Sequence, residues 1–154
     1  MWIRAGVIAA LVLTCAAPVA AQDPEALRQV GVDARSQVLA NMTLFQCGGE
    51  PCAAATAEEL ASPPLSDDEA GRIAGTALLS ALAEHCGLDW SGQSFMPLMR
   101  EWRMQPGGSN RKYALISGVH GFVQAQALDA FRANGECDEQ TRAAVQATLD
   151  DSRD

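Results

Sequence analysis

Apolar residues recur at steps of three and four along most of this chain, and glycine, proline or helix-capping residues interrupt the pattern at intervals. Residues 24–46 show it first, with one apolar face made by Leu27, Val30, Ala34, Val38, Met42 and Phe45. That period matches an α-helix with one buried face, whereas a half-buried strand would alternate at every second residue. No segment shows a convincing strand pattern. The sequence therefore predicts an all-α bundle of five or six helices joined by short loops.

Capping and breaking residues set the expected boundaries of these helices. Ser66 and Glu69 have the spacing of a capping box, in which each side chain bonds the other residue's backbone N–H. Single N-caps are expected at Asp23, Ser94, Ser109 and Asp138. The expected helices run from 24 to about 46, 51 to about 61, 67 to 86, 95 to about 102, 110 to about 134 and 139 to about 149.

The helix expected at residues 67–86 carries two glycines, Gly71 and Gly75, one turn apart. In a membrane this spacing favours helix dimerisation. In a soluble chain we expect it to let a neighbouring helix approach closely. The inward face of this helix is expected to consist of Ile73, Ala77, Leu78, Ala81, Leu82 and Cys86.

The first 21 residues show the order of features that signal peptidase recognises. Arg4 supplies a positive charge, residues 5–17 form an apolar run, and small residues precede a cut before Gln22. The run is shorter than the about 20 apolar residues that a membrane-spanning helix needs. We therefore expect residues 1–21 to be a cleaved signal peptide, with no membrane insertion after cleavage.

Cleavage would leave a chain of the size and charge of a small acidic domain. Removing 21 of the 154 residues leaves 133, a common length for a single domain, so residues 22–154 are predicted to form one all-α domain. The segment removes one of the 11 basic residues and none of the 19 acidic ones, so the mature net charge is −9. Nucleic acid is disfavoured as a partner, since phosphate contacts need a basic face.

Export and residue usage together indicate a compartment. Ten of the 11 basic residues are arginine, and alanine occurs 28 times, a bias typical of a GC-rich bacterial genome. With the signal peptide, this bias predicts that the mature protein lies in the bacterial periplasm or is secreted.

Cysteine usage agrees with an oxidising compartment, because cleavage removes Cys15 and leaves four cysteines. An even number in an exported domain predicts two disulfides, although four cysteines permit three pairings. We favour Cys47–Cys52 and Cys86–Cys137, because glycines and a proline form a turn between the first two. Zinc is disfavoured because no second closely spaced cysteine pair follows. No metal or other cofactor is expected.

Basic residues gather at one place in this acidic chain. Arg100, Arg103, Arg111 and Lys112 fall within 13 residues beside Trp102 and flank a Gly-Gly loop. Arginine suits bidentate recognition of carboxylate or phosphate, so the cluster is a candidate site for a small anion or an acidic protein. The alternative is that these residues pair with the protein's own carboxylates, as surface charges commonly do.

His120 is the second candidate, with Gln124 one turn further along the same helix. His120 lies on the apolar face and has Gly118 and Gly121 beside it. It could act as a general base, for which Glu84 on another helix is a candidate partner. The alternative is a buried histidine that is hydrogen-bonded within the core.

Methionine supplies a third candidate. Met96, Met99 and Met104 lie close together in sequence, and Met42 lies earlier. Methionine with histidine can bind copper(I), which suggests a copper carrier. The alternative is core packing, since Met96 and Met99 are at helical spacing beside aromatic residues.

These observations favour a binding or interaction protein over an enzyme. The leading hypothesis is an exported accessory or chaperone-like factor of the cell envelope, whose partner is an envelope protein or a small anionic ligand. An acid-stress chaperone would expose apolar surface, and brighten a reporter dye, below about pH 4. The alternatives are a small envelope hydrolase that uses His120 as general base, and a copper carrier. Any functional surface is expected within residues 84–124.

Overall fold

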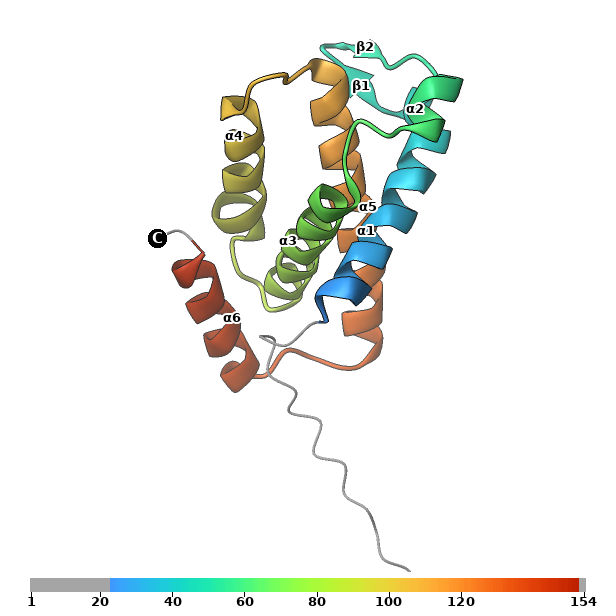
Figure 1. The fold of residues 1–154 in the computed structure, drawn as a ribbon. Helices are drawn as coiled ribbons and strands as arrows, with labels where there is room; N and C mark the ends of the chain where they lie inside the picture. The colour runs from blue at the N-terminus through green and yellow to red at the C-terminus, as the bar shows by residue number, and fades with distance from the viewer. Residues whose placement is uncertain (1–22, 153–154) are drawn as a thin grey trace, which may run out of the picture.

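The computed structural model describes residues 23–152 and confirms an all-α, disulfide-linked bundle. Three long helices lie side by side as its body, and two shorter ones lie along one flank (Figure 1). The signal peptide expected at residues 1–21 falls outside the described residues. The helices are α1 (Pro24–Ala40), α2 (Ala57–Ala61), α3 (Asp67–His85), α4 (Met96–Met104), α5 (Asn110–Ala133) and α6 (Glu139–Asp151). No helix of the described part is long and apolar enough to cross a bilayer.

α1 and α3 approach each other closely at Gly71, one of the two glycines predicted to allow this, whereas Gly75 makes only an ordinary contact with the side chain of Leu27. A Cβ atom added at Gly71 would lie 2.8 Å from the Cα of Arg28 on α1. On the opposite side of the contact, a Cβ at Gly31 would lie 2.2 Å from the backbone carbonyl of Ala70. The two backbones therefore touch, and no larger residue fits between them.

Replacing Gly31 by alanine is expected to lower the free energy of unfolding by about 2 kcal/mol or more, because the new methyl group would overlap rigid backbone. The matched control is Gly121→Ala on α5, where an added Cβ meets no atom within 4 Å. There, alanine should stabilise the helix by up to about 1 kcal/mol. Urea unfolding of both variants measures the difference, and equal effects would show that the α1–α3 contact is not this close.

The main core lies between α1, α3, α4 and α5. Its largest fully buried side chains include those of Trp102, Met42, Leu65, Ile73, Leu115 and Ile116. Gly118 of α5 faces Val38 of α1, and an added Cβ there would lie 2.7 Å from the valine side chain. A second, smaller core joins the lower end of α3 to α6 through Ala83, Cys86, Val145 and Leu149.

Both predicted disulfides are present. Cys47–Cys52 closes a local loop, and Cys86–Cys137 ties the end of α3 to the segment before α6. The two Cα–Cα distances are 5.0 and 5.1 Å.

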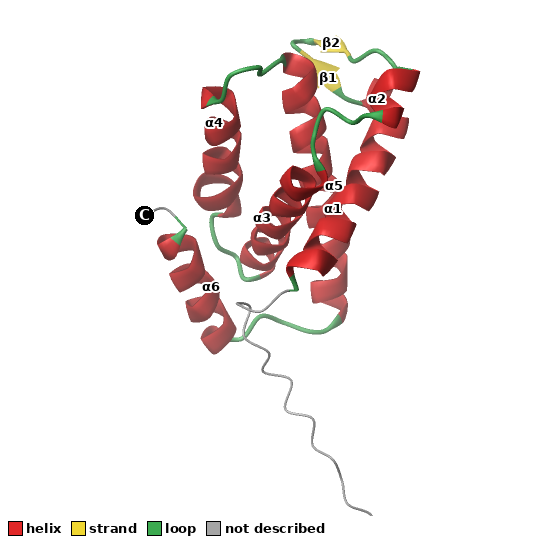
Figure 2. Cartoon of the chain, in the orientation of Figure 1, coloured by secondary structure: helices red, strands yellow, loops and turns green. Residues whose placement is uncertain are grey.

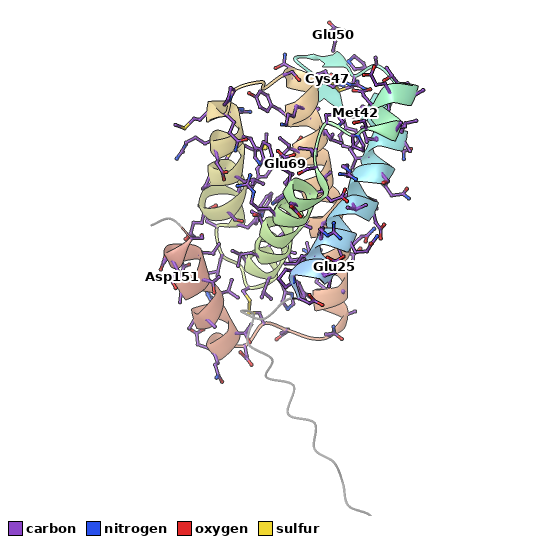
Figure 3. All side chains as sticks on the ribbon, viewed as in Figure 1. Glu25, Met42, Cys47, Glu50, Glu69 and Asp151 are labelled. Carbon is purple, nitrogen blue, oxygen red and sulfur yellow. A yellow bond between two sulfur atoms is a disulfide. The ribbon has the colours of Figure 1, made fainter. Side chains whose placement is uncertain are left out.

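The prediction that the chain has no strand was wrong at one place. Gln46–Cys47 (β1) and Glu50–Pro51 (β2) form a two-residue antiparallel hairpin above the helices (Figure 2). Gly48 and Gly49 both have positive φ, 73° and 98°, which a tight hairpin turn requires and other residues resist. Glu50 projects from the tip of this hairpin (Figure 3). Because Pro51 belongs to β2, the next helix begins at Ala57 and not at residue 51, with Thr56 and Glu59 as its capping box.

The first helix also ends earlier than expected. α1 stops at Ala40, and a short 3-10 turn, Met42–Leu44, follows it. Its buried face is rotated from the predicted one, so that Gly31 and Arg35 are buried and Val30 is 41% exposed. Arg35 is accommodated because it donates to the carbonyl of Leu65 and to Asp67. The close α1–α3 contact through Gly31 sets this rotation.

Ser94 does not cap a helix, contrary to the sequence prediction. A wide π-turn, Ser91–Phe95, leads directly into α4, and Ser94 is buried within it. Just before this turn, the side chain of Asp89 accepts a hydrogen bond from the N–H of Gly92 at 2.9 Å. The wide turn suits Pro97, which has no N–H and whose ring would crowd the carbonyl four residues earlier in a regular α-helix.

Candidate functional site

The basic cluster divides into two parts with different roles. Arg111 donates to both carboxylate oxygens of Glu59, at 2.5 and 2.7 Å, and to the carbonyl of Ala53 at 2.8 Å. This hydrogen bonding lowers the pKa of the Glu59 carboxyl to about 2. Arg111 therefore fastens the segment after the hairpin to the start of α5, as the alternative of internal pairing predicts.

Lys112 is likewise engaged within the protein. Its ammonium group lies 4.9 Å from the ring centre of Trp102 and 3.9 Å from Glu69. Arg72 of α3 approaches the same ring, at 5.1 Å, so two cations from different helices contact Trp102. Trp102 is 1% exposed and belongs to the core. Trp102, which the sequence places beside the candidate binding site, is therefore inaccessible to a ligand at the surface.

Arg100 and Arg103, unlike Arg111 and Lys112, form no ion pair within residues 23–152. Six of the nine basic residues within residues 23–152 form ion pairs with the protein's own carboxylates: Arg28, Arg35, Arg72, Arg111, Lys112 and Arg132. Over the same range, Arg100, Arg103 and Arg142 form none. Arg100 and Arg103 are exposed on α4, and the guanidinium of Arg103 lies 5.9 Å from the ring centre of Tyr113. Glu101, the acidic residue of α4, pairs with Arg72.

A groove lies between α4 and α5. Arg103 lines it, and Arg100 lies on α4 one turn from Met96 and Arg103. It encloses about 420 Å³, and α4, α5 and the β-hairpin all contribute to it. We call it the α4–α5 groove; its lining residues are Gln46, Gly48, Phe95, Met96, Met99, Arg103, Asn110, Tyr113, Ala114 and Ser117. Apolar and aromatic side chains thus lie next to a cation in an otherwise acidic protein.

His120 lies in the core, 1% exposed, as its alternative interpretation predicts. Its Nε2 is 3.0 Å from the hydroxyl of Ser80, which is 2.8 Å from the hydroxyl of Ser94. Ser94 donates in turn to the carbonyl of Thr76, at 3.4 Å. In this order each hydroxyl accepts one bond and donates one, which places the proton of the neutral imidazole on Nε2. The three side chains join α3, the π-turn and α5.

The surroundings of His120 disfavour its charged form. Burial lowers the pKa of His120 to about 4. The ring of Phe95 lies 4.8 Å from the imidazole and that of Trp90 lies 6.4 Å from it, centre to centre. Phe95 also lines the α4–α5 groove, so one aromatic residue links the buried histidine to the surface.

Glu84 does not partner His120. Glu84 instead accepts a hydrogen bond from Gln124, at 2.7 Å, and lies 3.7 Å from Arg132. Gln124 is buried, so it positions a carboxylate between α3 and α5 and offers no binding surface.

Ser80 and Ser94, the partners of His120, were not predicted from the sequence. Ser80 has a detectable signal, because it lies three and seven residues after Ala77 and Ile73 on the buried face of its helix. A lone hydroxyl on such a face needs a buried partner. Ser94 has no such signal, since its orientation depends on the π-turn.

The four methionines do not come together as one ligand set. Met42 and Met99 are buried in the core, while Met96 and Met104 are 47% and 80% exposed on α4. Figure 3 shows Met42 near the upper end of α1, on a different element from the other three. Within residues 23–152, histidine, cysteine and carboxylate side chains form no group of three or more that could hold a metal ion.

No family model, no curated protein and no solved structure matches this chain.

Proposed function

We propose that this protein is an exported binding protein of the bacterial cell envelope, an accessory or chaperone-like factor that acts on another protein in the periplasm or outside the cell. The N-terminal signal pattern and the two disulfides support export, since disulfides persist mainly in oxidising compartments. The net charge of −9 expected after cleavage favours solubility and disfavours nucleic acid and anionic lipid as partners.

One observation carries the binding role. Arg100 and Arg103, which have no ion pair within residues 23–152, are exposed on α4 together with Met96 and Met104. Of these, Arg103 and Met96 line the α4–α5 groove. Elsewhere in the described chain most cations are paired. A surface that combines unpaired cations with exposed flexible apolar side chains is typical of a protein-binding site.

A small hydrolase is the second candidate, favoured by the contact between His120 and Ser80. Ser94, the next hydroxyl of this chain, lines a cavity of about 170 Å³. Two observations weaken this alternative. His120 and Ser80 are 1% and 0% exposed, and the Nε2 of His120 is placed to donate to Ser80. A general base would have to accept a proton at that nitrogen.

The proposal is tested in cells of a bacterium that exports the full chain. A photo-crosslinking amino acid is placed at Met104, the exposed last residue of α4, and in a matched strain at Ala147, which is exposed on α6. We expect a periplasmic protein that begins at Gln22, with cysteines that alkylate only after reduction, and an adduct with an envelope protein from position 104 alone.

Three outcomes would contradict it: an uncleaved cytoplasmic chain, no adduct at either position, or equal adducts at both. A fluorophosphonate probe separates the two candidates on the purified protein. The binding role predicts no labelling, whereas a hydrolase would be labelled at Ser94 in the native chain and not in Ser94→Ala.

A further inference from the structure

We propose that the α4–α5 groove binds an acidic peptide segment of a partner protein, with an apolar side chain of that segment inserted between the two helices. This inference rests on the proposed binding function and names its surface and the chemistry of its partner. Three features of the groove support it: the positive charge on α4, the apolar lining, and the polar groups at its edge.

The positive charge of Arg100 and Arg103 favours a ligand that carries a carboxylate. Arg100 and Arg103 share the outward face of α4 with Met96 and Met104, because these positions are four, seven and eight residues apart. Glu101 cannot neutralise them, since it pairs with Arg72 on the side facing α3. An exposed guanidinium offers paired N–H donors in the geometry of a carboxylate. An acidic partner therefore gains two ion pairs without breaking an internal one.

The lining selects an apolar side chain beside that carboxylate. Phe95, Met99, Tyr113 and Ala114 form the wall between the helices, and Met96 stands half-exposed at its edge. Methionine adapts to differently shaped apolar groups, so the groove does not require one particular residue. Burial of one leucine or phenylalanine side chain contributes about 2 to 3 kcal/mol.

The edge of the groove carries groups that suit a peptide backbone. Gln46 on β1 and Asn110 at the start of α5 bring side-chain amides, each of which can both donate and accept. Gly48, two residues after Gln46, lies against the side chain of Asn110, and the disulfide Cys47–Cys52 closes the hairpin at this edge. A lipid or a simple anion would use the cations and the apolar wall but not these amides.

The experiment selects ligands for the mature, oxidised protein from a phage-displayed library of random peptides. We expect the selected peptides to be enriched in Asp and Glu next to a large apolar residue. The best peptide should bind the double variant Arg100→Glu/Arg103→Glu at least about tenfold more weakly, because two attractions become repulsions. Affinity for the native chain should also fall as salt is raised.

The matched control is Arg142→Glu, which changes an exposed arginine of α6 that has no ion pair within residues 23–152. It should retain the native affinity. Selected peptides without acidic enrichment, or equal binding to the double variant, would overturn the proposal. Met96→Ala supplies a second test, since it leaves every charge in place and should weaken binding several-fold.

Sedimentation of the native chain over a range of concentrations tests whether a second copy of the chain occupies the groove. If the chain dimerises and the double variant does not, a second copy fills the groove and the proposal of a partner peptide is wrong. The test in cells distinguishes a wrong groove proposal from a wrong proposed function. If only the groove proposal is wrong, the adduct from position 104 still forms in the double variant. If the proposed function is wrong, no adduct forms in the native chain.

Discussion

Replacing Cys86 and Cys137 together by serine is expected to lower the free energy of unfolding by about 4 kcal/mol. The bridge spans 51 residues, so it removes much of the freedom of the unfolded chain. It also fastens α6, which otherwise contacts the bundle through a small core containing Val145 and Leu149. We therefore expect α6 to detach before the rest of the bundle unfolds.

The matched control is Cys47→Ser/Cys52→Ser, whose bridge spans only five residues and is expected to contribute about 2 kcal/mol. Urea unfolding gives the two free energies, and hydrogen exchange in native buffer locates the detached segment. Amides of residues 139–151 should lose protection in the first variant and keep it in the second. Equal losses of stability, or full protection of α6 without its bridge, would contradict the prediction.

The helices and both disulfides could be predicted from local signals. Ser66 and Glu69 mark the start of α3 because a capping box involves only one turn of backbone. The glycines between Cys47 and Cys52 favour a local bridge, which leaves Cys86 and Cys137 to pair across the chain. In each case, residues close in sequence determine the structure.

The hairpin is local, and its Gly48-Gly49 turn is a signal that the prediction of a helix from residue 51 did not use. The rotation of α1 and the π-turn could not be predicted from local signals. Both depend on contacts between distant segments, such as Gly31 against Ala70 or Ser94 against Ser80. The basic cluster failed as a single site for the same reason. Arg111 and Arg103 belong to one cluster in the sequence. Arg111 forms an ion pair with Glu59, 52 positions away, whereas Arg103 is exposed.

Lowering the pH from 7 to 4 is expected to remove about 3 kcal/mol of stability through His120 alone. Burial places the pKa of His120 at about 4 in the folded protein, against 6.5 in the unfolded chain. Above pH 6.5 both states are neutral at this group and its full contribution is present. As the pH falls from 6.5 to 4, the unfolded state binds a proton that the folded state excludes, so stability decreases.

His120→Gln isolates this effect, because glutamine can still donate to Ser80 but has no proton to gain. The variant is expected to be less stable at pH 7, yet its stability should fall less between pH 6.5 and 4 than that of the native protein. The carboxylates titrate in both proteins, so the difference between the two curves reports His120. Parallel curves would contradict the prediction, as would an imidazole NMR signal from His120 that titrates near pH 6.5.

Protonation of His120 has a consequence for the surface as well. Protonation would place a positive charge between Ser80, Phe95 and Trp90. A buried charge without a counter-ion costs free energy. Separation of the π-turn from α3 and α5 would relieve it and would carry Phe95, a wall of the α4–α5 groove, with it. A dye that reports apolar surface should therefore brighten below about pH 4 in the native protein. In His120→Gln the dye signal should begin to rise at a lower pH. An identical onset in both proteins would show that protonation of His120 does not expose the groove.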